Sequence, residues 1–126
     1  MPDRRRDDRI AINQECSLYP QGLGEICCTI RDISEVGIAF ELAYDEPLYE
    51  AIKMGTTITF SYLDEFTYMN ENKVYIITRE CQVVRKVKSD KTVVVGCTLT
   101  ADEELKKYIT CRKVSSFVEA LKHHRK

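Results

Sequence analysis

The sequence predicts a mainly β fold, in which a six-stranded antiparallel β-barrel is followed by a C-terminal α-helix. Short, β-branched segments follow one another without the strand–helix–strand alternation of parallel sheets. Residues 101–126 then change to apolar side chains at helical spacing, and such a helix can cover one open end of a barrel. Considered alone, this pattern also permits a sandwich of two sheets.

Length and charge set limits on domain organisation and on partners. The 126 residues suffice for one domain with a modest core but not for two. We expect a single domain over residues 1–126, made of an arm (1–9), a barrel (10–100) and a helix (101–126). The net charge of −1 excludes a protein that binds nucleic acid through overall positive charge. Any anion site must therefore come from a local cluster of cations.

The sequence predicts a cytoplasmic protein that does not insert into a membrane. No segment approaches the roughly 20 apolar residues that span a bilayer. The first residues, Met1–Arg4, lack the apolar core of an export signal. In such a chain we expect reduced thiols, and because no CxxC or zinc spacing occurs we expect no metal or cofactor. Each thiol is interpreted as a small buried hydrophobe: Cys16, Cys27, Cys28, Cys81, Cys97 and Cys111.

Six segments have the composition and alternation of strands, and turn-forming residues separate several of them. Between the third and fourth, apolar residues at helical spacing after Pro47 predict one or two helical turns within residues 45–54. The predicted strands are 10–18, 25–33, 37–42, 56–62, 73–87 and 92–100.

The C-terminal segment has a helix start signal. Thr100-x-x-Glu103 fits a capping box, in which a hydroxyl and a carboxylate each satisfy a free backbone N–H. Asp102 and Glu104 add favourable negative charge in the first turn. Polar residues near 112–116 separate two apolar stripes, so the pattern permits either a bent helix or two short helices.

Two short motifs carry the candidate chemistry. The first is Arg5-x-x-x-Arg9, with Arg4 beside it, and the second is Asp32-x-Ser34-x-x-Gly37. Arginine presents a planar fork of donors that matches phosphate oxygens and also stacks on a flat ring. An Asp and a Ser on a turn offer short polar side chains beside free backbone N–H groups, and glycine avoids a Cβ clash there.

The order and spacing of these motifs resemble the PilZ family. Two later segments add to the resemblance: Cys81–Arg85 is similar to the family's G-x-V-V-R strand, and Val94–Leu99 is similar to its I-G-V-x-F strand. The likeness spans residues 4–100 in the right order. Val36 departs from the family pattern, in which a second glycine is common, and Asp7 and Asp8 lie between the arginines.

The resemblance implies a Greek-key barrel that binds cyclic di-GMP, a bacterial second messenger in motility and biofilm control. It implies that Arg5 and Arg9 contact phosphate and guanine, with Arg4 as an auxiliary contact. Arg85 either lines the same surface or is a solvated or ion-paired strand residue.

The resemblance also assigns roles to the turn. Asp32 would accept hydrogen bonds from the N1–H and N2–H edge of guanine, because an ionised carboxylate is only an acceptor. Ser34 would bond to a guanine edge or to a neighbouring backbone group. Gly37 would be a geometric requirement rather than a contact.

These roles predict a receptor, in which ligand binding orders the arm and switches an unidentified protein target. One alternative is a PilZ-like adaptor in pilus or motility control that no longer binds nucleotide. A second alternative is a small barrel for single-stranded RNA or DNA. That function requires aromatic platforms along a basic groove, whereas the aromatic residues here are dispersed, so we expect no nucleic-acid partner.

The sequence does not predict an enzyme. Its histidines are the adjacent pair His123 and His124 near the end of the chain. No Ser/His/Asp or Cys/His set can be assembled from it. The oligomeric state stays open.

Overall fold

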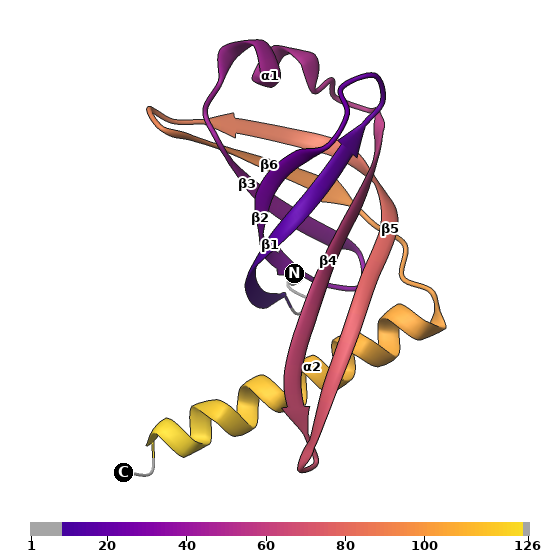
Figure 1. The fold of residues 1–126 in the computed structure, drawn as a ribbon, viewed down its shortest axis with the longest axis vertical. Helices are drawn as coiled ribbons and strands as arrows, with labels where there is room; N and C mark the ends of the chain where they lie inside the picture. The colour runs from indigo at the N-terminus through magenta and orange to yellow at the C-terminus, as the bar shows by residue number, and fades with distance from the viewer. Residues whose placement is uncertain (1–8, 125–126) are drawn as a thin grey trace, which may run out of the picture.

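A computed structural model of the chain describes residues 9–124 (Figure 1). The six strands pair antiparallel in the closed order β1-β2-β3-β6-β5-β4, so the barrel is confirmed over the sandwich. Helix α1 lies at one end of the barrel and helix α2 crosses the other (Figure 1). The elements are β1 (Ile10–Pro20), β2 (Ile26–Ile33), β3 (Gly37–Ala43), α1 (Glu46–Ala51), β4 (Thr57–Tyr68), β5 (Glu71–Lys88), β6 (Thr92–Thr98) and α2 (Glu103–His124).

The barrel interior is filled by alternate side chains of every strand. Phe40 and Phe60 pack with their ring centroids 5.5 Å apart near its middle. Because side chains alternate with a period of two, a filled interior fixes which residues of each strand face outward. Each strand contributes at least one apolar side chain with 0% exposure, among them Leu18, Ile30, Phe40, Phe60, Val83 and Val95.

The hairpin of β4 and β5 is longer than the sequence predicts. Strand β4 continues six residues beyond the predicted end at Tyr62 and reaches Tyr68. Met69 and Asn70 then turn the chain with positive φ values of 54° and 64°, as a two-residue hairpin turn requires. The prediction stopped early because Asp64 interrupts the apolar alternation, although its side chain is fully buried (0% exposed).

Helix α2 is one uninterrupted helix, and its cap differs from the predicted one. The Asp102 carboxylate, rather than the Thr100 hydroxyl, accepts from the Leu105 backbone N–H at 2.8 Å. Arg79 holds the same carboxylate with bonds of 3.1 and 3.3 Å. The capping box was therefore wrong, because an acidic residue two positions later makes the N-cap bond and also has a cationic partner.

A buried polar cluster joins α2 to the barrel. Asp64 on β4 accepts from the Tyr108 hydroxyl at 2.7 Å and from the Arg112 Nε at 2.8 Å, both on α2. It also accepts from the Gln14 amide of β1 at 3.3 Å. The Tyr62 and Tyr108 hydroxyls lie 2.9 Å apart, and burial raises the pKa of both phenols. These bonds fix α2 across the open end of the barrel.

We predict that Asp64→Ala lowers the free energy of unfolding by about 3–5 kcal/mol, because it leaves the Arg112 guanidinium without its buried partner. Urea unfolding followed by circular dichroism measures this loss. The matched control is Glu65→Ala, at the next residue, whose exposed side chain accepts from Asn72 at 2.8 Å; its effect should stay within about 0.5 kcal/mol. Equal effects for the two variants would contradict a clamping role for Asp64.

Candidate ligand-binding site

The turn between β2 and β3 is closed by Ser34. Its backbone N–H donates to the Gly37 carbonyl at 2.8 Å. Its hydroxyl oxygen accepts from the N–H groups of Val36 and Gly37 at 3.2 and 3.1 Å. Because the side chain is only 1% exposed, it holds the turn together from the inside. Of the two roles expected for Ser34, this geometry matches the bond to neighbouring backbone, and the ligand contact stays a prediction.

Val36 fits the turn without backbone strain. Among the described residues, the positive-φ positions other than glycine are Asn13, Met69 and Asn70, so Val36 has an ordinary φ. Its carbonyl accepts from the Leu99 N–H at 3.0 Å, and its side chain is 55% exposed. A valine at this position is therefore compatible with the turn.

The two sequence motifs meet in space. Arg9, just before β1, donates from Nη1 to Oδ1 of Asp32 at 2.9 Å. The Arg9 side chain is 45% exposed and that of Asp32 is 29% exposed, so both groups remain within reach of a ligand. Arg4 and Arg5 lie outside the described residues.

Gly37 provides the space that this ion pair occupies. A Cβ on Gly37 would lie 2.9 Å from the Arg9 Nη2 and 3.4 Å from the Cys97 carbonyl oxygen. Gly37 is not among the positive-φ glycines, which are Gly22, Gly24 and Gly55. Its requirement for glycine therefore comes from the close approach of the arginine rather than from a sharp bend.

Small residues form a floor beside the ion pair. Asp32 pairs with Ala39, Ala39 with Gly96, and Gly96 with Arg85, in a row that crosses β2, β3, β6 and β5. A Cβ on Gly96 would lie only 3.1 Å from the Arg85 Nη2, so the Arg85 guanidinium folds over this glycine. Of the two alternatives for Arg85, the structure favours the barrel surface that holds the motifs. A glycine within a β-branched strand was the sequence signal of such a close approach.

This arrangement suits a flat ligand that carries negative charge. Guanidinium groups at both borders of the floor match phosphate oxygens and can stack on a planar ring. The Asp32 carboxylate offers acceptors to ring N–H donors. Among residues 9–124, no group of His, Cys, Asp and Glu side chains is arranged to hold a metal ion.

Comparison with known proteins identifies the family. The model of the PilZ domain matches residues 3–111. This chain belongs to the PilZ domain family. No curated protein matches the sequence.

Two solved structures share the PilZ fold with this chain. The inhibitor of motility MotI (DgrA) from Bacillus subtilis superposes with a TM-score of 0.65 at 14% identity, over 96% of this chain and 53% of MotI. This chain thus spans about half the length of MotI. The PilZ domain of YcgR from Escherichia coli, solved with c-di-GMP, superposes with a TM-score of 0.60 at 14% identity, over 98% of this chain and 97% of that one. At such identities, the likeness establishes the fold alone.

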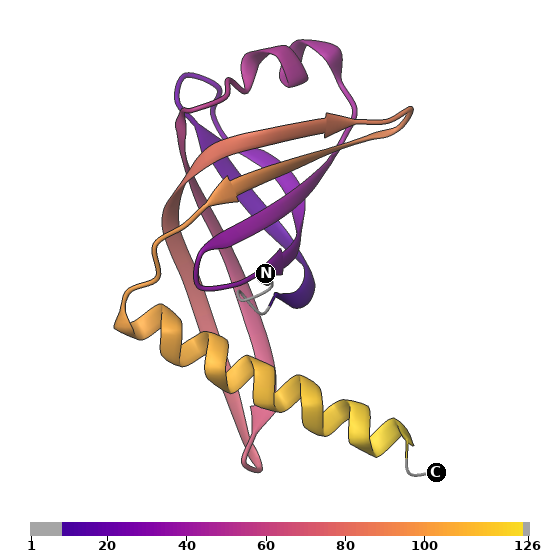
Figure 2. The ribbon, with the colours of Figure 1, turned by 180° about the vertical axis from the view of Figure 1, so that it is seen from behind.

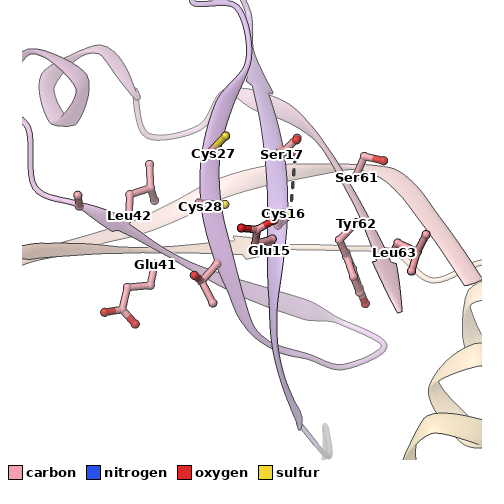
Figure 3. A pocket seen from close by; sticks show the side chains of 12 residues that line it. Glu15, Cys16, Ser17, Cys27, Cys28, Glu41, Leu42, Ser61, Tyr62 and Leu63 are labelled. Carbon is pink, nitrogen blue, oxygen red and sulfur yellow. Dashed lines mark hydrogen bonds between the residues drawn. The ribbon is translucent and has the colours of Figure 1, made fainter. Parts of the chain in front are cut away.

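A separate hollow of about 530 Å³ lies on the flank of the PilZ barrel, among β1, β2, β3 and β4 (Figure 3). Glu15 and Glu41 line it, and none of the described residues that line it is Lys or Arg, so its described lining is unsuited to phosphate. Cys27, on the same wall, is exposed, whereas the other five cysteines are buried. The prediction of a buried thiol was therefore wrong for Cys27, because its position in the alternation of β2 points outward next to the inward-facing Cys28.

We predict that Ser34→Ala lowers the free energy of unfolding by about 1–3 kcal/mol, because two backbone N–H groups of the turn lose their buried acceptor. Thermal or urea unfolding without ligand measures it. The control is Glu35→Ala, an exposed residue of the same turn, which should change stability by less than about 0.5 kcal/mol. A Ser34→Ala variant as stable as the parent protein would show that the hydroxyl does not hold the turn.

Proposed function

We propose that this PilZ domain is a cytoplasmic receptor for cyclic di-GMP that acts on a protein partner and has no catalytic role. The observation that carries the proposal is the Arg9–Asp32 ion pair, which joins the two motifs over Gly37 at 2.9 Å. Membership of a family that includes a PilZ domain solved with c-di-GMP supports the same ligand.

When the ligand binds, Arg9 and Asp32 each exchange the other for a group of the ligand. Cyclic di-GMP carries two phosphates in a ring and two guanines. The Asp32 carboxylate accepts from the N1–H and N2–H edge of a guanine, while the Arg9 guanidinium turns to a phosphate. In the free protein each group already has an oppositely charged partner at the surface, and this ion pair holds the two side chains side by side.

The remaining cations enclose the ligand from two sides. Arg4 and Arg5 of the arm close over it, and Arg85 borders the floor on the β5 side. Such an exchange orders the arm against the barrel and creates a new surface for the protein target. The cost of ordering the arm is offset by charge-assisted hydrogen bonds, so affinity should fall as salt rises.

Isothermal titration with cyclic di-GMP tests the proposal directly. We expect binding by the parent protein, at least ten-fold weaker binding by Arg9→Ala or Asp32→Ala, and none by the Arg5→Ala/Arg9→Ala double variant. Each charge-assisted bond contributes about 1.5–3 kcal/mol, which corresponds to roughly ten-fold or more in affinity. Arg85→Ala should weaken binding without abolishing it.

Arg79→Ala is the matched control, because Arg79 is also ion-paired on the barrel, to Asp102 at 3.1 Å, but faces α2. GTP serves as the ligand control. If the parent protein gives neither heat nor a thermal shift with cyclic di-GMP, the receptor function is wrong and a nucleotide-independent adaptor takes its place.

A second variant tests the geometry rather than the charges. We predict that Gly37→Ala changes stability by less than about 1 kcal/mol, because the clashing atom, 2.9 Å from the new Cβ, is the far end of a flexible arginine. Cyclic di-GMP affinity should nevertheless fall several-fold, since Arg9 is displaced from Asp32. Thr98→Ala changes the cross-strand neighbour of Gly37 and should leave affinity unchanged. Undiminished affinity in Gly37→Ala would argue against a role for the placement of Arg9.

A further inference from the structure

Helix α2 has two opposite faces of different character. Residues such as Tyr108 and Arg112 face the barrel and are buried or partly buried. Val114 and the residues three, four and seven positions after it share one face of the helix, which points away from the barrel. This second face exposes four apolar side chains, Val114 (42%), Phe117 (64%), Val118 (42%) and Leu121 (48%).

These four residues, here termed the outer stripe, lie on the half of α2 that extends past the β4–β5 hairpin. Figures 1 and 2 show α2 crossing β4 and β5 toward the turn of their hairpin, and the C-terminal half of the helix continues beyond the two strands. The barrel therefore cannot cover the outer stripe, and its apolar surface is open to a partner.

Lysines surround the outer stripe. Lys113 borders it on one side and Lys122 on the other, and Lys106 and Lys107 lie nearer the start of the helix; all four are exposed. The acidic residues on this side, Glu103 and Glu104, are confined to the first turn, away from the outer stripe. Glu119 is seven residues after Arg112 and so follows the barrel-facing side.

The basic helix contrasts with an acidic barrel. From the start of α2 onward, residues 103–126 contain seven Lys or Arg and three acidic residues, whereas residues 10–102 contain fourteen acidic residues and eight Lys or Arg. The molecule therefore has a positive end at α2, and a negatively charged surface would orient it with this helix facing that surface.

We propose that the outer face of α2 binds the surface of an anionic lipid bilayer. The helix lies in the plane of the headgroups, Phe117 and its aliphatic neighbours enter the boundary of the acyl chains, and the lysines on both flanks contact lipid phosphates. This combination of a short apolar stripe and flanking lysines is typical of helices that lie on a membrane. No described helix is both long and apolar enough to cross a bilayer.

The charges disfavour a second copy of this chain as the occupant. Two α2 helices that pair antiparallel through the outer stripe match Val114 with Leu121, and they also bring Lys113 toward Lys122 of the other copy. Like charges at the border of so small an apolar contact oppose association. An acidic protein surface would satisfy the lysines, and the experiment below separates it from lipid.

Co-sedimentation of the full chain with vesicles tests the proposal. We expect several-fold more protein to be bound by vesicles of equal parts phosphatidylglycerol and phosphatidylcholine than by pure phosphatidylcholine vesicles, with the excess lost at high salt. Phe117→Ser/Leu121→Ser removes apolar contact while keeping charge, and Lys113→Gln/Lys122→Gln removes charge while keeping the outer stripe. Both double variants should lose most of the binding.

Two controls match these variants. Ile76→Ser removes an apolar side chain that is 71% exposed on the outer face of β5, and Lys53→Gln/Lys91→Gln removes two exposed charges from the barrel. Neither should change vesicle binding. Equal binding to both vesicle types, or equal loss in the controls, would overturn the proposal and leave an acidic protein as the partner. A dimer that sedimentation velocity detects in the parent protein and not in Phe117→Ser/Leu121→Ser would also overturn the proposal, because a second copy would then occupy the outer stripe. Cyclic di-GMP affinity, measured on the same variants, should not change.

Discussion

The buried carboxylate of Asp64 is the interaction on which the arrangement of the molecule depends. It lies at 0% exposure and joins three elements through hydrogen bonds from Tyr108, Arg112 and Gln14. A carboxylate so placed is tolerable only while all its donors stay in position, because an unpaired buried charge is costly. These bonds hold the helix across one end of the barrel, and the outer wall of the barrel stays uncovered.

Strand β1 connects this cluster to the proposed ligand site. Gln14 follows Asn13, whose positive φ of 54° marks the point where β1 shifts register against β2, between Ala11 and Gln14. Arg9 lies just before the start of this strand and bonds to Asp32 on β2. The bond from Gln14 to Asp64 thus fixes the irregular part of β1 from which Arg9 extends. The polar cluster around Asp64 and the Arg9–Asp32 ion pair are therefore connected through the short backbone segment 9–14.

Local patterns in the sequence were sufficient for the six strands, since alternation is itself local, whereas the resemblance to a family was needed to assign Arg9 and Asp32 to one site. The local patterns failed where a long-range partner overrides the pattern. Asp64 resembles a loop residue until Arg112 and Tyr108 are brought beside it, and Asp102 becomes the cap of α2 partly because Arg79 holds it. Arg85 stayed ambiguous for the same reason, because its placement over Gly96 depends on the pairing of β5 with β6.

A net charge of −1 conceals two separate concentrations of positive charge. At the barrel wall, the exposed Arg9 is paired with Asp32, so a ligand that takes over the arginine leaves the carboxylate in need of a new donor. In the receptor that we propose, this pairing favours a ligand with both an anionic group and N–H donors. On the outer face of α2, Lys113 and Lys122 border an apolar stripe, with Glu119 directed to the other side of the helix. That face accepts any extended anionic surface with an apolar layer beneath it. The position of the carboxylates thus distinguishes the two regions: Asp32 is paired with the cation at the barrel wall, whereas Glu119 lies away from the lysines on the outer face of α2.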